Sequence, residues 1–258
     1  MKRIKKRRVK IKREKKAKIV RPGRIKEEKV TTGIPGFDKL LKGGFNKDTV
    51  NLVVGGSGSG KTIFAVQFLI DGLKKGEPCL LITFEENREE FYQNMLHFGW
   101  DLEKYEKSGK FVFLEYSPEK VRSMLEEGGG AVESVVLKNK IQRIVIDSIT
   151  SFSLLFENEM ARRKAALSLF DITKKWNCTS LLTLEEDPAV KEKGESESIE
   201  FEVDGIIYLY FVRRKVKRER FLEVLKMRGI KHSTEIYPFD ITEKGIIVKG
   251  PIFRDHLI

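Results

Sequence analysis

The feature that most constrains this chain is a glycine-rich turn between an apolar strand and a helical pattern. Gly55 and, after four residues, Gly60-Lys61-Thr62 follow the apolar run 50–54, and this is the spacing of a phosphate-binding loop. Glycines let backbone N–H groups curl around phosphates, and the following helix adds its positive N-terminal end. Lys61 would reach the terminal phosphates of a nucleoside triphosphate, and the Thr62 hydroxyl would ligate Mg²⁺. The predicted nucleotide cradle consists of Gly55, Gly56, Ser57, Gly58, Ser59, Gly60, Lys61, Thr62 and Ile63.

Length and composition place the chain among soluble proteins. Its 258 residues are enough for one large α/β domain. No apolar run reaches the length of a membrane span, and the N-terminus lacks the apolar core of a signal peptide. We therefore expect a cytoplasmic protein without a membrane span. Cys79 and Cys178 lie in apolar runs, which favours buried, reduced thiols over a disulfide or a metal site.

The positive charge is concentrated at the N-terminus. Residues 1–28 contain fifteen Lys and Arg against three Glu, so this segment carries a net charge of +12, which equals that of the whole chain. Such a segment repels itself and has few apolar side chains to bury, so we expect a disordered basic tail over 1–28 followed by a folded domain over 29–258. Two interpretations stay open: a contact with the phosphates of nucleic acid or another polyanion, or a solubilising tail.

Alternating strand and helix patterns predict the fold class. Beyond the loop, apolar strands ending near Thr83 and at 111–114, 143–148 and 178–184 are separated by helical stretches. This alternation indicates an α/β fold with a mainly parallel twisted sheet, helices on both faces, and ligands at the carboxyl ends of the strands. The first of these strands is expected beside the strand that precedes the loop.

The last third of the sequence changes pattern. A polar, acidic loop is expected over 185–203, followed by a hairpin of strands 204–212 and 221–227 and by further antiparallel strands within 233–248. Charged turns are usually solvated, so we favour a solvated hairpin tip over a contact with nucleic acid, and both interpretations remain open. The basic residues of this turn are Arg213, Arg214, Lys215, Lys217, Arg218 and Arg220.

Three carboxylates are candidates for the chemistry of hydrolysis. Glu85 and Glu86 end a predicted strand, where a carboxylate can orient and deprotonate the attacking water. We favour Glu85 as the base, with Glu86 assisting it or binding Mg²⁺-bound water, over the alternative of a solvated strand end. Asp147 follows a buried apolar strand and fits the position of a Walker-B carboxylate, which holds the hydration shell of Mg²⁺.

Six dispersed segments carry a resemblance to a known family. The segments occur in the same order as in the KaiC-like branch of the RecA superfamily, which the chain resembles from about Val30 to the C-terminus. The resemblance implies a RecA-like P-loop NTPase core that assembles into a ring, usually a homohexamer, with ATP between subunits. His97 stands where relatives place a smaller polar residue near the nucleotide. The segments are 31–45, 55–62, 83–86, 98–102, 144–148 and 226–232.

The same resemblance gives the C-terminal part of the chain a role in the site. Lys226 and Arg228 would approach the γ-phosphate of the neighbouring subunit, where a guanidinium stabilises charge in the transition state. On pattern alone, these two residues would be assigned to one face of a strand. The residues that the resemblance places near the nucleotide from this part of the chain are Lys226, Met227, Arg228, His232, Thr242 and Glu243.

These inferences lead to one main hypothesis and two alternatives. The main hypothesis is an Mg²⁺-dependent ATPase that acts as an oligomeric regulatory or remodelling switch. The alternatives are a nucleic-acid-acting ATPase that uses the basic tail and hairpin, and an ATP-binding scaffold with negligible hydrolysis. A circadian role is not carried over, because the chain has one P-loop and no convincing counterpart of the phosphorylated Ser-Thr pair of the clock protein.

Overall fold

A computed structural model describes residues 28–84, 86–150, 156, 158–188 and 202–250. The basic tail, Glu85 and most of the acidic loop at 185–203 lie outside these described residues, so the predictions made for them are not addressed. The helices are α1 Phe37–Leu40, α2 Lys61–Lys74, α3 Arg88–Leu96, α4 Leu102–Lys107, α5 Pro118–Glu126, α6 Gly130–Asn139 and α8 Glu159–Lys175. The strands are β1 Lys29–Val30, β2 Phe45–Asn46, β3 Val50–Gly55, β4 Cys79–Thr83, β5 Phe111–Glu115, β6 Arg143–Asp147, β7 Thr179–Glu185, β8 Gly205–Arg214, β9 Lys217–Met227, β10 Tyr237–Thr242 and β11 Gly245–Val248.

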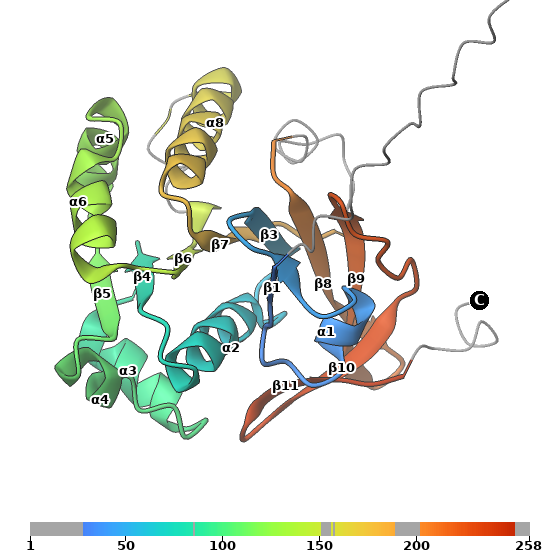
Figure 1. Cartoon of the computed structure of the whole chain (residues 1–258). Helices are drawn as coiled ribbons and strands as arrows, with labels where there is room; N and C mark the ends of the chain where they lie inside the picture. The colour runs from blue at the N-terminus through green and yellow to red at the C-terminus, as the bar shows by residue number, and fades with distance from the viewer. Residues whose placement is uncertain (1–27, 85, 151–155, 157, 189–201, 251–258) are drawn as a thin grey trace, which may run out of the picture.

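One nine-stranded sheet organises the molecule (Figure 1), in the order β11-β10-β9-β8-β3-β7-β6-β4-β5. The six neighbouring strands β8-β3-β7-β6-β4-β5 pair in parallel. Strands β9, β10 and β11 extend the sheet beyond β8 with antiparallel pairs. A separate ribbon joins β1 to β2. The predicted α/β class, the parallel sheet and the antiparallel C-terminal extension are therefore confirmed.

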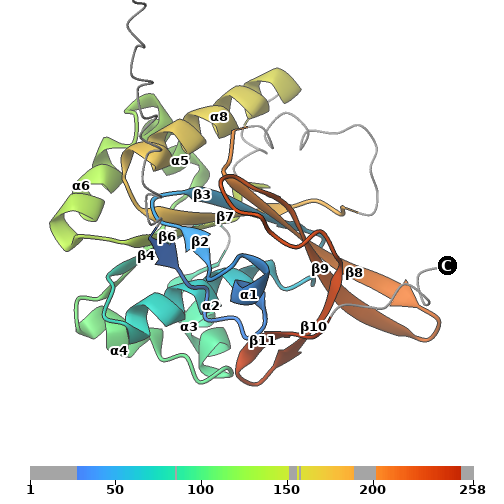
Figure 2. The same cartoon turned by 45° about the vertical axis from the view of Figure 1, so that its right-hand side comes forward.

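Helices cover both faces of the sheet, as the alternation of side chains along a strand requires. Figure 2 shows α5, α6 and α8 above the sheet and α1 to α4 below it. In β3, Val53 joins the core on the α2 side, whereas Leu52 and Val54 join the core on the α8 side. All three side chains are essentially unexposed. This burial on both faces explains why the parallel strands are continuous apolar runs in the sequence.

An aromatic cluster fixes the segment before β3 onto the helix that follows the loop. Phe37 meets Phe64 edge to face with ring centroids 5.0 Å apart, and Phe45 meets Phe68 at 5.9 Å. All four rings are fully buried, and burial of each contributes about 1.5–3 kcal/mol. The N-terminal segment is thus a structural cover for α2, which positions the phosphate loop.

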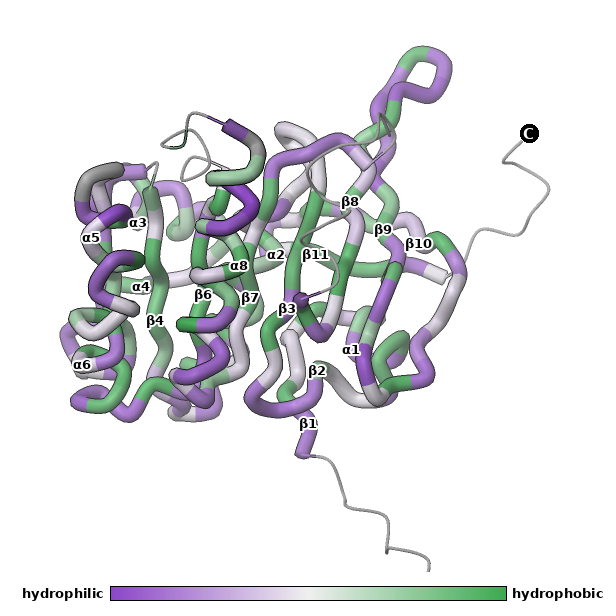
Figure 3. The backbone as a smooth tube through the Cα atoms, turned by 90° about the horizontal axis from the view of Figure 1, so that it is seen from above, coloured by the Kyte–Doolittle hydropathy of each residue, from purple (hydrophilic) through white to green (hydrophobic). Residues whose placement is uncertain are grey.

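Three details of the fold differ from the sequence-based expectation. The strand that ends near Glu85, β4, is not beside β3, because β6 and β7 lie between them. The basic turn after 212 is mostly strand, since β8 and β9 continue pairing to Arg214 and Lys217 and leave a two-residue connection. The resulting hairpin projects beyond the rest of the sheet (Figure 3). Helix α4 was not predicted; the Asp101 side chain caps its N-terminus.

The cysteine prediction is confirmed, because Cys79 and Cys178 are both buried free thiols. Burial raises the pKa of Cys178 to about 12 and raises the pKa of Cys79 further, so both remain protonated at neutral pH. Among the described helices, none combines the length and the apolar composition that crossing a membrane requires.

Candidate functional site

The phosphate loop lies between β3 and α2 and depends on the absence of side chains at its glycines. Gly58 and Gly60 have φ angles of 72° and 103°, in the left-handed region that glycine adopts readily. At Gly55 the constraint is space, because a Cβ atom there would lie 2.5 Å from the Ser59 hydroxyl and 2.7 Å from the carbonyl oxygen of Leu209. The sequence pattern therefore folds into the predicted loop for identifiable steric reasons.

The loop has the donors that a phosphate group needs. Gly60 caps α2 without a side-chain hydrogen bond, and the first helical turn contains no acidic residue, so the N–H groups and positive end of the helix face the loop. Among the described residues, the buried Ser59 hydroxyl has no hydrogen-bond partner. Lys61 is only 8% exposed, and its Nζ donates to the Gly56 carbonyl at 3.1 Å. These groups fit a bound polyphosphate.

Polar groups continue from the loop along the carboxyl ends of the neighbouring strands. Gly55 is in register with Glu185 of β7, and the Glu185 carboxylate lies 3.8 Å from Lys61 Nζ. Asp147 ends β6 and is 9% exposed, and its carboxylate accepts a hydrogen bond from the Thr183 hydroxyl. The structure thus orients the predicted Walker-B carboxylate through a neighbouring strand.

Sequence reasoning missed the contributions of β7 to this edge. The sequence pattern assigns Thr183 to an apolar strand and Glu185 to the polar loop that follows. A usable signal is nevertheless present, because the carboxyl end of any parallel strand near the loop is a candidate ligand position. The residues of β7 do not by themselves indicate that this strand lies beside β3.

Glu86 lies after the carboxyl end of β4, at the same edge of the sheet. Its backbone N–H donates to the Thr83 hydroxyl at 3.5 Å, and the residue is half-buried. Thr83 is in register with Asp147, so the two carboxylate-bearing strand ends are neighbours. No cluster of three or more His, Cys, Asp or Glu suited to a metal occurs in the described part of the chain. Mg²⁺ does not require one, since it is commonly held by one or two protein ligands together with phosphates and water.

The residues expected to act across a subunit boundary lie at the opposite edge of the sheet. Met227 pairs with Gly205, which pairs with Asn51 near the start of β3. Lys226 donates to the Val203 carbonyl at 2.8 Å, and the Arg228 guanidinium lies 3.3 Å from a carboxylate oxygen of Asp204. His232 lies beyond them, with Nδ1 2.7 Å from the Ser233 carbonyl oxygen. The distance from Lys226 and Arg228 to the phosphate loop of the same chain is therefore roughly the length of β3, about 15 Å or more.

Thr242 lies on the phosphate-loop side instead. A Cβ atom added to Gly60 would lie 3.0 Å from the side chain of Ile241, the residue before Thr242. Thr242 donates to the Gly245 carbonyl at 2.9 Å in the turn that carries the exposed Glu243. His97 is exposed at the C-terminus of α3. The C-terminal residues transferred through the resemblance thus divide into two groups at opposite edges of the sheet, with Thr242 and Glu243 on the phosphate-loop side and the others on the far side.

A contact that sequence reasoning did not find covers the apex of the phosphate loop. The Arg220 guanidinium donates two hydrogen bonds to the Gly58 carbonyl, at 3.2 and 3.0 Å. The same guanidinium lies 4.1 Å from the ring centroid of Phe211. No local pattern predicts this contact, because Arg220 is 162 residues from Gly58.

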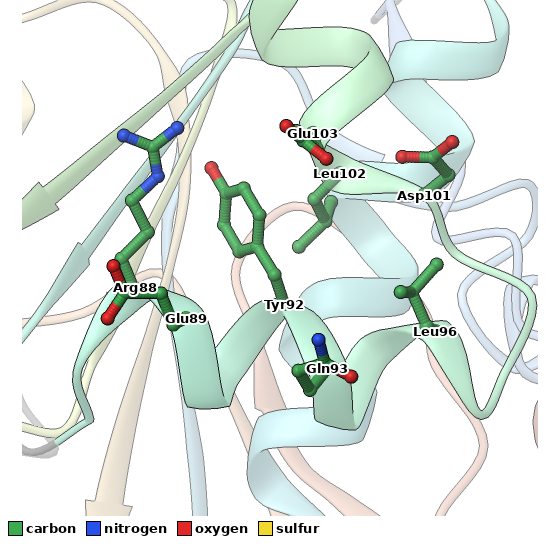
Figure 4. Close-up of a pocket in the computed structure, with 8 residues that line it drawn as sticks. All are labelled: Arg88, Glu89, Tyr92, Gln93, Leu96, Asp101, Leu102 and Glu103. Atoms are coloured by element: carbon green, nitrogen blue, oxygen red, sulfur yellow. The ribbon is translucent and has the colours of Figure 1, made fainter.

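A separate surface pocket of about 300 Å³ lies between α3 and α4 (Figure 4). The Tyr92 side chain stands between Arg88 and Leu102 in this view. Arg88 forms an ion pair with Glu106, which also accepts a hydrogen bond from the Tyr92 hydroxyl at 3.0 Å. Burial, with Glu106 as the next cause, raises the pKa of Tyr92. These contacts join the two helices to each other and involve no residue of the phosphate loop.

The fold and the loop define a RecA-like P-loop protein of the α/β class. More narrowly, the chain belongs to the KaiC ATPase family, because the family model described as "ATPase: KaiC" matches residues 30–251. The resemblance inferred from the six sequence segments is thereby confirmed.

Similar proteins agree with this assignment. A UPF0273 protein of Pyrococcus horikoshii is 38% identical over 85% of this chain and 93% of its own length. The circadian clock protein KaiC3 of Synechocystis is 36% identical over 86% of this chain, but the match spans only 45% of KaiC3. The crystal structure of a KaiC-like protein from Pyrococcus horikoshii superposes with a TM-score of 0.77 at 37% identity, covering 87% of this chain and all of that one.

Proposed function

We propose that the chain binds ATP with Mg²⁺, hydrolyses it slowly, and acts as an oligomeric regulatory or remodelling switch. The observation that carries the proposal is the phosphate loop itself, where the N-terminus of α2 lacks a side-chain cap and a buried lysine lies beside it. A triphosphate seated there would accept hydrogen bonds from the first turn of α2 and from the buried Ser59 hydroxyl. Membership of an ATPase family makes ATP the expected nucleotide.

Different residues of this chain would bind the phosphates, hold the metal and activate the attacking water. Lys61 would move from the Gly56 carbonyl to the terminal phosphates, and the Thr62 hydroxyl would be a ligand of Mg²⁺. Asp147, held by Thr183, would orient water molecules around the metal. Bound Mg²⁺ would supply positive charge to the phosphates as the bond to the leaving group breaks. Glu85 or Glu86 would orient and deprotonate the attacking water.

A second subunit would complete the site. Lys226 and Arg228 lie at the far edge of the sheet from the loop of their own chain, so they are suited to act only on a neighbour. A ring that places this edge against the loop of the next subunit would bring Arg228 to the γ-phosphate, where its guanidinium stabilises transition-state charge. The contacts of Lys226 with Val203 and of Arg228 with Asp204 would be exchanged for phosphate contacts during assembly.

The decisive experiment measures ATP binding by calorimetry, and phosphate release by a size-resolved assembly, with and without Mg²⁺. Lys61→Met should weaken ATP binding by roughly 100-fold, which corresponds to about 2.7 kcal/mol. Lys74→Met removes an exposed lysine from the same helix and is the matched control. Wild-type protein that binds no ATP in the presence of Mg²⁺ would refute the proposal.

Further variants separate hydrolysis from binding and test the second subunit. Glu85→Gln combined with Glu86→Gln should retain ATP binding and abolish turnover. Wild-type turnover no higher than that of this double variant would instead support a scaffold without hydrolysis. Mixing Lys61→Ala with Arg228→Ala subunits should restore part of the turnover, because some interfaces then contain an intact lysine and an intact arginine. Lack of any recovery would exclude Arg228 as the residue supplied by the neighbour.

A further inference from the structure

The hairpin of β8 and β9 forms a two-stranded ribbon that continues past its neighbours in the sheet (Figure 3). The registered pairs of β8 with β3 end at Leu209, and those of β9 with β10 end at Arg220. Beyond these points β8 and β9 pair with each other as far as Arg214 and Lys217, which makes a ribbon roughly 15 Å long. Val216 at its tip is 97% exposed.

The charge of this ribbon is unfavourable for a hairpin without a partner. Residues 210–220 contain six basic residues and one acidic residue. Arg213 is directly opposite Arg218, and Arg214 is directly opposite Lys217. Like charges in directly opposed positions destabilise a pair of strands. Two consecutive pairs of this kind indicate that the cations serve an anionic ligand rather than the stability of the hairpin.

Carboxylates of the protein offset only part of this charge. Glu219 pairs with both Arg214 and Lys217, at 3.5 and 2.7 Å. Arg218 instead lies 5.2 Å from the centroid of the Phe211 ring, and its N–H donates to the Phe211 carbonyl at 3.5 Å. Arg220 contacts the Phe211 ring and the Gly58 carbonyl, and the nearby carboxylate of Asp240, which attracts it, is already paired with Lys249. Both guanidinium groups therefore retain charge that an external anion can neutralise.

A groove of about 640 Å³ runs along the base of the ribbon between β9 and β10. Asp240 in its wall is already paired with Lys249. The residues that give the groove its basic character are Arg214, Lys217, Arg218, Arg220 and Lys249.

We propose that this ribbon and groove bind duplex DNA through its phosphates, with the ribbon entering the major groove. The major groove of B-form DNA, about 12 Å wide, admits a two-stranded β-ribbon, whereas the major groove of A-form RNA is too deep and narrow for such an element. The cations would neutralise phosphates on both sides of the groove, so binding would depend little on sequence.

The contact of Arg220 with Gly58 would connect DNA binding to the phosphate loop. Any movement of β9 on DNA would act on the Gly58 carbonyl through two hydrogen bonds. This second part of the inference rests on the proposed nucleotide binding, whereas DNA binding by the ribbon does not.

DNA binding is tested with the full chain, without nucleotide, by fluorescence anisotropy of a labelled DNA duplex about two helical turns long. Replacing Arg213, Lys215 and Arg218 by Gln should weaken binding at least tenfold and lower the salt slope by about 0.9 for each lost phosphate contact. The matched control replaces three tail cations, Lys2, Arg3 and Lys5, by Gln and should change affinity less than threefold. Equal weakening by both triple variants, or binding of an RNA duplex as tight as that of DNA, would overturn the proposal.

Coupling is tested by the affinity for a fluorescent, non-hydrolysable ATP analogue with and without the DNA duplex. In the wild-type chain the duplex should shift this affinity at least threefold, and in Arg220→Gln, which keeps the other hairpin cations, the shift should disappear. Wild-type chain that binds both ligands without any shift would refute the coupling. A chain that binds DNA but no nucleotide would refute the proposed function and the coupling while leaving the DNA site supported.

Discussion

Charged side chains at the two edges of the parallel sheet meet very different surroundings. At the amino edge, Arg143 is 1% exposed. Its guanidinium donates to Glu77 at 2.5 Å, lies 3.1 Å from Asp71, and donates to the carbonyl oxygens of Thr31 and Phe68 at 2.8 Å each. We call Arg143, Asp71 and Glu77 the amino-edge cluster. It ties β6 to α2 and to the N-terminal cover.

At the carboxyl edge, Lys61 is 8% exposed; its ammonium group donates to the Gly56 carbonyl at 3.1 Å and lies 3.8 Å from the carboxylate of Glu185, whose side chain is 46% exposed. The buried Ser59 hydroxyl beside it lacks a hydrogen-bond partner within the described residues. The buried guanidinium group at the amino edge is thus fully engaged by protein groups, whereas at the carboxyl edge the Ser59 hydroxyl can bind a ligand. Substitutions in the amino-edge cluster should therefore change stability, and those around the phosphate loop should change binding.

The largest effect is expected for Arg143→Met. Removing one partner of a buried ionic network leaves the other charges buried without compensation, which typically costs about 3–5 kcal/mol. Glu77 would lose its ion-pair partner, whereas Asp71 would keep its contacts with Lys75 and Thr31. The free energy of unfolding, measured with denaturant, checks this. Lys107→Met, which removes an exposed pair with Glu103 at 2.7 Å, is the control and should cost less than about 1 kcal/mol. Similar values for the two variants would contradict the assigned role of the cluster.

A smaller loss is expected for Gly72→Ala, which tests how closely Arg143 crosses α2. A Cβ atom on Gly72 would lie 2.6 Å from Arg143 Nε and 2.7 Å from its Cδ. Alanine is favoured over glycine in helices by up to about 1 kcal/mol, yet overpacking should reverse the sign and destabilise by about 1–3 kcal/mol. Gly130→Ala is the matched control, because Gly130 begins α6 and a Cβ atom there would meet nothing within 4 Å. Stabilisation by both substitutions would contradict the close crossing.

The amino-edge cluster should also appear in the acid dependence of stability. Burial raises the pKa of Asp71, but hydrogen bonds from Lys75 and Thr31 and the charge of Arg143 outweigh it, so the pKa is lowered overall. A lowered pKa in the folded state stabilises above the unfolded value, near pH 4, and this contribution is lost as pH falls through the folded pKa. The stability difference between wild type and Asp71→Asn should therefore shrink on acidification.

Asp38 provides an internal control for that experiment, because its pKa shifts the other way. Burial raises the pKa of Asp38 despite hydrogen bonds from the Thr32 N–H and hydroxyl. A raised carboxyl pKa favours the folded state at low pH, and this advantage is lost as pH rises through the folded pKa. Unfolding curves should be measured between about pH 3 and 6. The stability of wild type relative to Asp38→Asn should fall as pH rises over this range, whereas its stability relative to Asp71→Asn should rise. Slopes of the same sign for both variants would show that the two environments are not distinguished.

What the sequence could predict depends on how local the interaction is. The glycine-rich turn, the apolar strands and the helices between them, apart from α4, follow from residue spacing within about a dozen positions, and the structure confirms these elements. The amino-edge cluster could not be found in this way, because Arg143 lies 66 residues from Glu77 and 112 from Thr31. From its sequence neighbours alone, Arg143 is simply the first residue of a buried strand.

The same reasoning explains the misplaced strand at the candidate site. A parallel strand carries its apolar pattern whatever its neighbours are, so the pattern of β4 gives no indication that β6 and β7 separate it from β3. Glu185 was overlooked for this reason, and so was the hydrogen bond that Thr183 donates to Asp147. The extent of the basic ribbon was also not predicted, because the contacts of Glu219 with Arg214 and of Phe211 with Arg218, which support pairing close to the tip, cross the hairpin.

The smallest expected effect concerns Glu185, whose carboxylate lies near Lys61. Its carboxylate attracts the ammonium group and would repel an incoming phosphate, but it is half-exposed and 3.8 Å away, so the interaction is worth at most about 1 kcal/mol. Glu185→Gln should therefore raise the affinity for ATP by up to about fivefold and leave the free energy of unfolding within about 0.5 kcal/mol of wild type. Glu103→Gln, at an exposed position of α4, controls for the change in net charge. A fall in ATP affinity for Glu185→Gln would instead mean that this carboxylate helps to bind the nucleotide, so that both the lysine and the carboxylate at the carboxyl edge serve the ligand.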